Sequence, residues 1–142
     1  MRSLWQLPNV DQISNKDKIN IKRDVSLDEC VDLLVDNHII SIFQGGSESG
    51  RRALGNRSII ANPSNYGVVQ SINESIKNRD FWMPFALTIL KEKHRKFIKN
   101  SKNFRADFMT MTFDTIEKNV SQISAGCHPY DKTVRPQILE KK

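Results

Sequence analysis

The chain of 142 residues has its most informative stretch between residues 45 and 58, which reads Gly45-Gly46-Ser47-Glu48-Ser49-Gly50-Arg51-Arg52-Ala53-Leu54-Gly55-Asn56-Arg57-Ser58. The apolar, β-branched run before it, residues 38–43, predicts a buried strand that leads into a glycine loop (residues 45–58). Glycines allow positive φ angles and close approach to a ligand, and the arginines add fixed positive charge. We therefore expect this loop to bind phosphate, and a solvated turn with incidental arginines is the alternative. The pattern is neither a P-loop nor a dinucleotide fingerprint.

Length and composition predict one soluble domain with its own core. Apolar residues make up 38% of the chain and charged residues 27%, without a signature of disorder. No apolar run reaches the length of a membrane span, and residues 1–8 lack the apolar core of a signal peptide, so a cytoplasmic location is expected. Cys30 and Cys127 have no partner at metal-ligand spacing and are expected to be reduced thiols.

Positive charge is concentrated in the middle of the chain. Residues 50–105 contain twelve Lys or Arg and three acidic residues, while the whole chain has a net charge of +6. Such a field suits nucleotide phosphates, a small phosphorylated substrate or nucleic acid. The arginines gather in a glycine loop rather than spreading over a face, which favours small phosphates over a nucleic-acid-binding module.

The pattern of residues along the chain predicts a mixture of helices and strands. Residues 1–25 are polar and read as a lead-in or linker, and Ser26 with Glu29 forms a capping box that starts a helix with one apolar face. A second helix is expected from residue 66, and further strands at residues 86–90 and 108–113 and after residue 135. The expected class is α/β or α+β, with one domain at residues 26–142.

Two cations in the predicted extended segment after the second helix form a candidate phosphate site. Lys77 and Arg79 are two residues apart, so in an extended chain they would lie on one face and could hold one phosphate group together. A solvated pair of cations in a basic protein is the alternative. The sequence also places His128 and Asp131 around a turn before Arg135, without the spacing of a metal site or a catalytic triad. No metal site is expected in this domain.

Several of these segments together resemble the C-terminal domain of the O-carbamoyltransferases, enzymes that carbamoylate nodulation factors and aminoglycoside-type antibiotics. The matching segments occur in the family's order and cover about residues 26–139: the strand at residues 40–44; Glu48, Gly50, Arg52-Ala53-Leu54-Gly55-Asn56-Arg57-Ser58-Ile59, Ala61 and Pro63; Asn73 ahead of Lys77-x-Arg79; Pro84-Phe85-Ala86; and His128 to Asp131, Thr133 and Arg135-x-Gln137.

The resemblance implies a YrdC-like domain, a twisted mixed sheet flanked by helices. Such a domain is expected to bind ATP, with Mg²⁺ as part of that substrate, and carbamoyl phosphate, and to form carbamoyl-adenylate. An upstream domain of the actin-like ATPase fold would then transfer the carbamoyl group to an acceptor hydroxyl. The implied nucleotide- and phosphate-binding residues are Lys77, Arg79, Arg52, Arg57, Ser58, Asn56 and Asn73, and the implied substrate-binding residues are Glu48, His128, Asp131 and Arg135.

The chain also departs from the family's pattern. Gly46 and Met83 stand where the family usually has arginine, and the Asn-Thr-Ser-Phe-Asn segment expected shortly after Gln137 does not occur before residue 142. The resemblance therefore predicts a domain that is incomplete at its C-terminus and that lacks the actin-like partner. Two other hypotheses stay open at this point: a non-catalytic module that binds RNA or DNA, and an inert fragment whose role is to pack against a partner domain.

Overall fold

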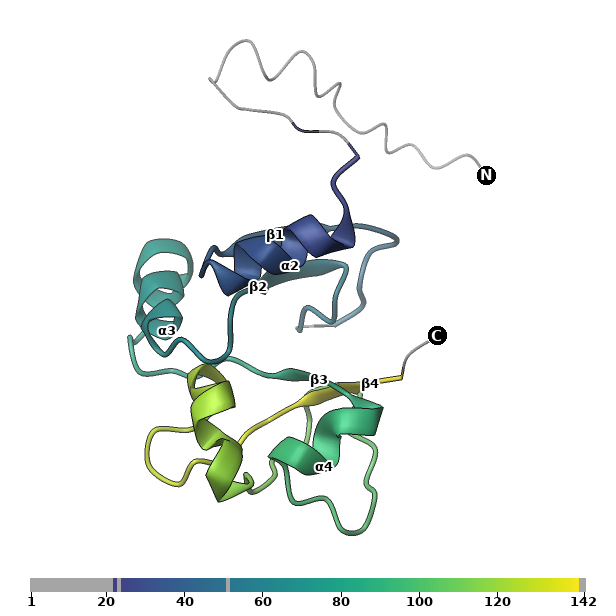
Figure 1. Ribbon diagram of the computed structural model, residues 1–142, viewed down its shortest axis with the longest axis vertical. Helices are drawn as coiled ribbons and strands as arrows, with labels where there is room; N and C mark the ends of the chain where they lie inside the picture. The colour runs from purple at the N-terminus through teal and green to yellow at the C-terminus, as the bar shows by residue number, and fades with distance from the viewer. Residues whose placement is uncertain (1–21, 23, 51, 141–142) are drawn as a thin grey trace. The chain divides into compact units, whose positions relative to one another are not determined.

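The computed structural model describes residues 22, 24–50 and 52–140 (Figure 1), so most of the predicted lead-in lies outside the described residues. Contacts divide the chain into a unit Met1–Val31 and a unit Asp32–Lys142. The elements are α2 (Leu27–Val35), β1 (Ile40–Phe43), β2 (Arg57–Ile60), α3 (Gly67–Ile72), the π-turn η1 (Asn73–Lys77), β3 (Thr88–Leu90), the short 3₁₀ helix η2 (Lys91–Lys93), α4 (His94–Phe97), the longer 3₁₀ segment η3 (Glu117–Gly126) and β4 (Gln137–Leu139). None of the helices in the described residues is long and apolar enough to cross a bilayer.

The α+β class is confirmed, and the described strands form two pairs instead of one continuous sheet. β1 and β2 are antiparallel, with Phe43 opposite Arg57, so the glycine loop connects the two strands of a hairpin. β3 and β4 are parallel, with Ile89 opposite Ile138. Parallel strands need a long crossover connection, and here η2, α4 and η3 lie in it.

The capping box that begins α2 is confirmed. The Ser26 amide donates to a Glu29 carboxylate oxygen at 3.0 Å, and the Glu29 amide donates to the Ser26 hydroxyl at 3.2 Å. The predicted core face of this helix is not found, because no residue of α2 is buried. Residues Ile40–Phe43 of the strand that follows alternate between half-buried and exposed, so it is not the buried strand that its apolar run predicts. Apolar periodicity identifies the element, but it does not tell what covers it.

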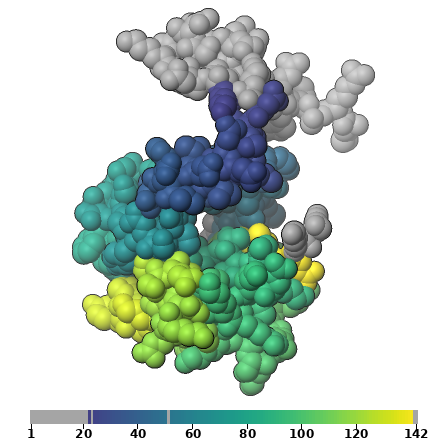
Figure 2. All heavy atoms as spheres, in the orientation of Figure 1, coloured from purple at the N-terminus to yellow at the C-terminus, as the bar shows by residue number. Residues whose placement is uncertain are grey.

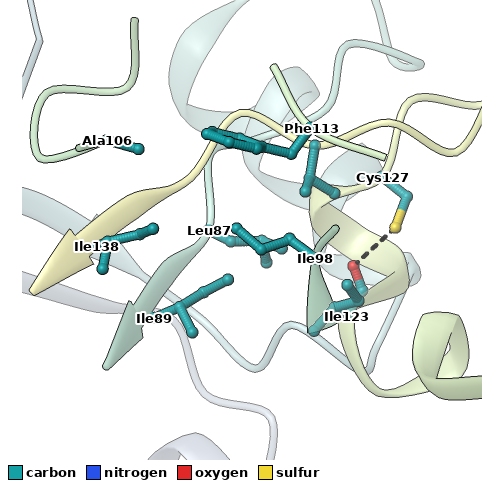
Figure 3. Close-up of a cluster of buried hydrophobic side chains, with 9 residues drawn as sticks. Leu87, Ile89, Ile98, Ala106, Phe113, Ile123, Cys127 and Ile138 are labelled. Atoms are coloured by element: carbon teal, nitrogen blue, oxygen red, sulfur yellow. Dashed lines mark hydrogen bonds between the residues drawn. The ribbon is translucent and has the colours of Figure 1, made fainter. Parts of the chain in front are cut away.

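The main hydrophobic cluster joins the β3–β4 pair to η3 and to the end of α4 (Figure 3). Ile98 and Val134 are almost fully buried in it, and α4 and η3 lie side by side (Figures 1 and 2). Gly126 is required by this packing, because a Cβ atom there would lie 2.4 Å from Cγ of Leu87. A second, smaller cluster consists of Val68, Val69, Ile72 and Ala125.

One predicted strand is wrong. Residues 108–113 do not form a strand, and the backbone of Met109 has a φ of +56°, which interrupts the extended chain that the alternating pattern indicates. Only Phe113 makes a β-bridge there, with Val134. The side chain of Phe113 is buried in the main cluster, so its apolar character reflects core packing and not a strand.

Candidate functional site

A buried asparagine at the start of the π-turn builds one wall of the candidate site. Asn73 is 0% exposed, and its amide nitrogen donates to the carbonyl oxygens of Phe81 at 3.2 Å and Met83 at 2.9 Å. Its amide oxygen accepts a hydrogen bond from Nε of Arg79. A single side chain thus holds both the backbone of residues 81–83 and the guanidinium of Arg79.

Arg79 lies at a hollow of about 280 Å³, which we call the arginine pocket. Its guanidinium carbon is 4.3 Å from the ring centroid of Phe85, a distance typical of a cation–π contact. The pocket is lined by residues from the segment before β3, from the end of η3 and from the chain that leads to β4: Arg79, Met83, Pro84, Phe85, Thr112, Gly126, His128, Thr133, Val134 and Arg135.

The ionisable side chains that line the arginine pocket are all basic among the described residues. Two arginines and a histidine line it, and no acidic residue is among the described lining residues. Partial burial lowers the pKa of Arg79, and the nearby charge of Arg135 lowers it further. Two guanidinium groups that repel each other across a small hollow are stabilised by an anion between them, and Arg presents a planar fork that suits phosphate. The arrangement is therefore a candidate oxyanion-binding site.

The turn at His128 places a histidine at the edge of the pocket. Nδ1 of His128 lies 3.1 Å from a carboxylate oxygen of Asp131. Asp131 also accepts hydrogen bonds from the amide and the hydroxyl of Thr133, at 2.9 and 2.8 Å, and these bonds lower the pKa of Asp131 together with His128. Asp131 thus fixes the turn and faces His128 rather than lining the pocket.

The glycine loop is held by its own glutamate. The carboxylate of Glu48 accepts hydrogen bonds from the backbone amides of Leu54 at 2.8 Å, Asn56 at 3.0 Å and Arg57 at 3.3 Å. These amide bonds, with the bond to Asn56 first, and the charge of Arg57 lower the pKa of Glu48 against the opposing effect of desolvation. Glu48 therefore fills the position of an anion among the loop amides, where the sequence predicts a contact to substrate.

Three of the predicted phosphate ligands in the loop, Arg57, Asn56 and Ser58, make their hydrogen bonds within it. The guanidinium of Arg57 donates to the carbonyl oxygens of Gln44 and Asn56 and contacts that of Gly45, and it stacks 3.7 Å from the ring centroid of Phe43. The Asn56 side chain donates to the carbonyl oxygen of Gly46 at 3.1 Å. The hydroxyl of Ser58 accepts from the amide of Gly55 at 2.9 Å.

The expected geometry of Lys77 and Arg79 is wrong. Lys77 ends the π-turn, and Asn78 has φ 46° and ψ 57°, a left-handed conformation that breaks any extended segment. Arg79 consequently lines the arginine pocket and Lys77 does not, although both residues are exposed. Arg52 is also exposed and does not line the pocket, and Arg51 lies outside the described residues.

The structure thus separates most of the predicted site residues into two groups, and Lys77 and Arg52 belong to neither. Arg79, His128 and Arg135 line the arginine pocket, with Asn73 and Asp131 behind them. The second group, Glu48, Asn56, Arg57 and Ser58, forms the internal bonds of the glycine loop. In the described part of the chain, His, Cys, Asp and Glu side chains form no group of three or more that could hold a metal ion.

Sequence reasoning missed the role of four residues. Thr112 and Gly126 line the pocket although nothing in their sequence context indicates a site. Phe85, which stacks on Arg79, could have been suspected from the Pro84-Phe85-Ala86 match. Gln137, buried at 5% exposure, donates from its side-chain nitrogen to the carbonyl oxygen of Leu54 at 3.0 Å and so joins β4 to the glycine loop.

Comparisons with known proteins find one matching family model and several relatives. A family model described as "Carbamoyltransferase C-terminus" matches residues 31–142. An uncharacterized protein of Methanocaldococcus jannaschii is 37% identical over 128 residues, which are 89% of this chain and 24% of that protein. The nodulation protein NolO of Bradyrhizobium diazoefficiens is 34% identical over 78% of this chain and 20% of that protein. The nodulation protein NolNO of Sinorhizobium fredii is also 34% identical, over 76% of this chain and 16% of that protein. The chain thus spans a quarter or less of the length of these relatives.

Proposed function

Since the chain belongs to the carbamoyltransferase C-terminus family, we propose that its arginine pocket binds the phosphate groups of carbamoyl phosphate and ATP. The single observation that carries this proposal is the convergence of Arg79 and Arg135 on one hollow whose described lining contains no carboxylate. Both substrates are polyanions, and both would compensate the mutual repulsion of the two guanidinium groups. A pocket of this size accommodates a phosphate or carbamoyl phosphate, so the adenosine of ATP would extend beyond it.

The proposed reaction is the formation of carbamoyl-adenylate in two steps. Water cleaves carbamoyl phosphate to carbamate and inorganic phosphate, and a carbamate oxygen then attacks the α-phosphorus of ATP, from which pyrophosphate leaves. Negative charge builds up on the phosphate oxygens during such a step, and donors fixed in advance at those oxygens lower the barrier. Arg79 is fixed in this sense, because Asn73 bonds its Nε and Phe85 covers its face. Arg135 would hold the second phosphate oxygen, and His128 at the rim would donate to the carbamoyl phosphate. Mg²⁺ would arrive bound to the triphosphate.

The proposed destination of the carbamoyl group is an acceptor hydroxyl bound by a partner domain. Two matched relatives carry the name nodulation protein, and both are several times longer than the region they share with this chain. We expect the complete enzyme to combine an activating region, represented by this chain, with a transferring domain of the actin-like ATPase fold. The class of acceptor would be set by that second domain.

Isothermal titration of the full chain with carbamoyl phosphate, with ATP-Mg and with both together tests the proposal. Arg135→Gln is expected to weaken binding about tenfold or more, because it removes one charge-assisted contact to phosphate. The matched control is Arg95→Gln, which removes an equal charge from an exposed arginine of α4 that bonds Asn103 outside the pocket.

Equal affinities of the two variants would contradict the assignment of the site. A folded chain that binds duplex DNA with a steep salt dependence, and that is not saturated by carbamoyl phosphate, would support the nucleic-acid hypothesis instead.

A further inference from the structure

The glycine loop and the arginine pocket are connected through one short path of hydrogen bonds. Glu48 binds the amide of Leu54 at 2.8 Å, and the carbonyl oxygen of the same residue accepts the side chain of Gln137 at 3.0 Å. Gln137 is the first residue of β4, and its own amide donates to the carbonyl oxygen of Leu87 at 2.7 Å. Arg135 lies two residues earlier, at the pocket.

We propose that Glu48 and Gln137 are positioning residues that brace the start of β4 and thereby hold Arg135 at the arginine pocket. This inference rests on the proposed function for its ligand, and it gives the glycine loop a mechanical role in place of direct phosphate binding. Neither residue lines the pocket, so both would act through the backbone of Leu54.

The contacts of the loop support a brace rather than an open ligand site. Three amides that could bind a phosphate already donate to the Glu48 carboxylate. The guanidinium of Arg57 donates to backbone carbonyl oxygens. A loop whose donors and acceptors are satisfied internally has one preferred conformation. That conformation has positive φ angles at residues 45 and 55, which glycine adopts without strain.

Gln137 is well placed to transmit the loop's position. It is buried, its side-chain nitrogen meets the loop, and its side-chain oxygen lies 3.4 Å from the hydroxyl of Thr88 on the neighbouring strand. A buried amide that loses such partners leaves unpaired polar groups, so the side chain has a strong preference for this single arrangement. Displacement of Leu54 would therefore displace the beginning of β4.

The effect of Glu48→Gln on anion affinity distinguishes two roles of the glycine loop. The loop is either a brace for β4 or a phosphate site whose amides Glu48 occupies. Glu48→Gln removes a negative charge, so electrostatics alone would leave anion binding unchanged or strengthen it, most of all where Glu48 competes with phosphate for the loop amides. A brace predicts the opposite, because the glutamine side chain cannot accept from all three amides and the loop loosens. We expect the Kd for carbamoyl phosphate, or for inorganic pyrophosphate as a simple probe, to rise roughly threefold to tenfold in Glu48→Gln.

The control for charge is Glu92→Gln, an exposed glutamate of η2 that is not a lining residue of the pocket. Its Kd is expected to equal that of the wild type within about twofold. A second variant, Gln137→Met, leaves the bonds of Glu48 to Asn56 and Arg57 in place but removes the donor to Leu54. It should weaken anion binding while the amides of the loop keep their protection from hydrogen exchange. Tighter or unchanged binding in both Glu48→Gln and Gln137→Met would overturn the proposal.

Hydrogen exchange of backbone amides tests the brace without any ligand. Glu48→Gln should speed exchange at Leu54 and Asn56 and also at Ile138 in β4, whereas Glu92→Gln should not. Faster exchange confined to the loop would overturn the brace even if the pocket binds anions. If the wild-type chain binds neither probe, the proposed function fails, and the response of Ile138 still decides whether the loop braces β4.

Discussion

The glycine loop and the arginine pocket both contain arginines that the sequence marks as phosphate ligands, and they use them in opposite ways. In the loop, Arg57 bonds carbonyl oxygens of the backbone and covers the ring of Phe43. In the pocket, Arg79 and Arg135 face one hollow, and the pKa of Arg79 is lowered first by its partial burial and then by the charge of Arg135. A positive charge in the sequence becomes a binding group only where the fold leaves its hydrogen-bonding capacity unused.

The largest expected effect concerns the wall of the pocket. Asn73→Ala leaves the carbonyl oxygens of Phe81 and Met83 and the Nε of Arg79 without their partner, and we expect it to lower the free energy of unfolding by about 2–4 kcal/mol. Urea denaturation measures this loss. Gln70→Ala, which removes an exposed side chain that bonds Glu74, is the control and should cost less than about 0.5 kcal/mol. Equal losses would mean that Asn73 does not organise the pocket.

The contrast between Arg79 of the pocket and Arg57 of the loop can be tested by thermal unfolding with and without ligand. In the wild type, carbamoyl phosphate is expected to raise the melting temperature, because ligand binding stabilises the folded state. Arg79→Gln should reduce this ligand-induced rise strongly, whereas Arg57→Gln should retain most of it. A larger reduction in Arg57→Gln than in Arg79→Gln would reverse the assignment of the two regions.

Arg57 should instead contribute to stability. Arg57→Gln removes donors from backbone carbonyls of the loop and a cation–π contact, and we expect a loss of about 1 kcal/mol in the free energy of unfolding. Equilibrium unfolding in urea provides the value. Arg52→Gln, at an exposed position of the same loop, should change the stability by less than about 0.5 kcal/mol and serves as the matched control.

The smallest effect is a pH dependence from the turn beside the pocket. The pKa of Asp131 is lowered from 3.8 by its bonds to Thr133 and by His128. A lowered pKa in the folded state means that the stabilisation is complete above the unfolded value and is lost as pH falls through the folded value. The difference in stability between wild type and Asp131→Asn should therefore be constant near neutral pH and shrink below about pH 3.8. A difference that does not change with pH would assign the effect to packing alone.

Local sequence patterns predicted which helices and strands form better than they predicted what packs against them. The capping box at Ser26, the strand before the glycine loop and the helix from residue 67 are all found, because neighbouring residues determine them. The burial of α2, the strand at residues 108–113 and the shared face of Lys77 and Arg79 were wrong. Each of these depends on a tertiary contact or on a single residue with positive φ, at Met109 or Asn78, which periodicity does not reveal.

Sequence motifs named the residues of the candidate site but did not show which of them lie together in the structure. The resemblance to the carbamoyltransferases selected Arg79, His128 and Arg135, and the structure brings these three to one pocket. It also selected Glu48 and Arg57 as ligands, and only three-dimensional contacts show that their hydrogen bonds are made within the loop. Motif residues within a family therefore include both side chains that line a pocket and side chains that hold a loop together.

The π-turn from Asn73 to Lys77 makes the pocket sensitive to the number of residues in the chain. A π-turn holds one residue more than the corresponding α-helical turn, and such turns often occur at functional sites. Removal of one residue from this turn would let α3 continue as an α-helix, and the residues directly after the turn, up to Arg79, would rotate by about 100° around the helix axis relative to the rest of the pocket. Arg79 would then leave Phe85 and Arg135. A single-codon deletion here should abolish the site although it removes none of the residues that line it.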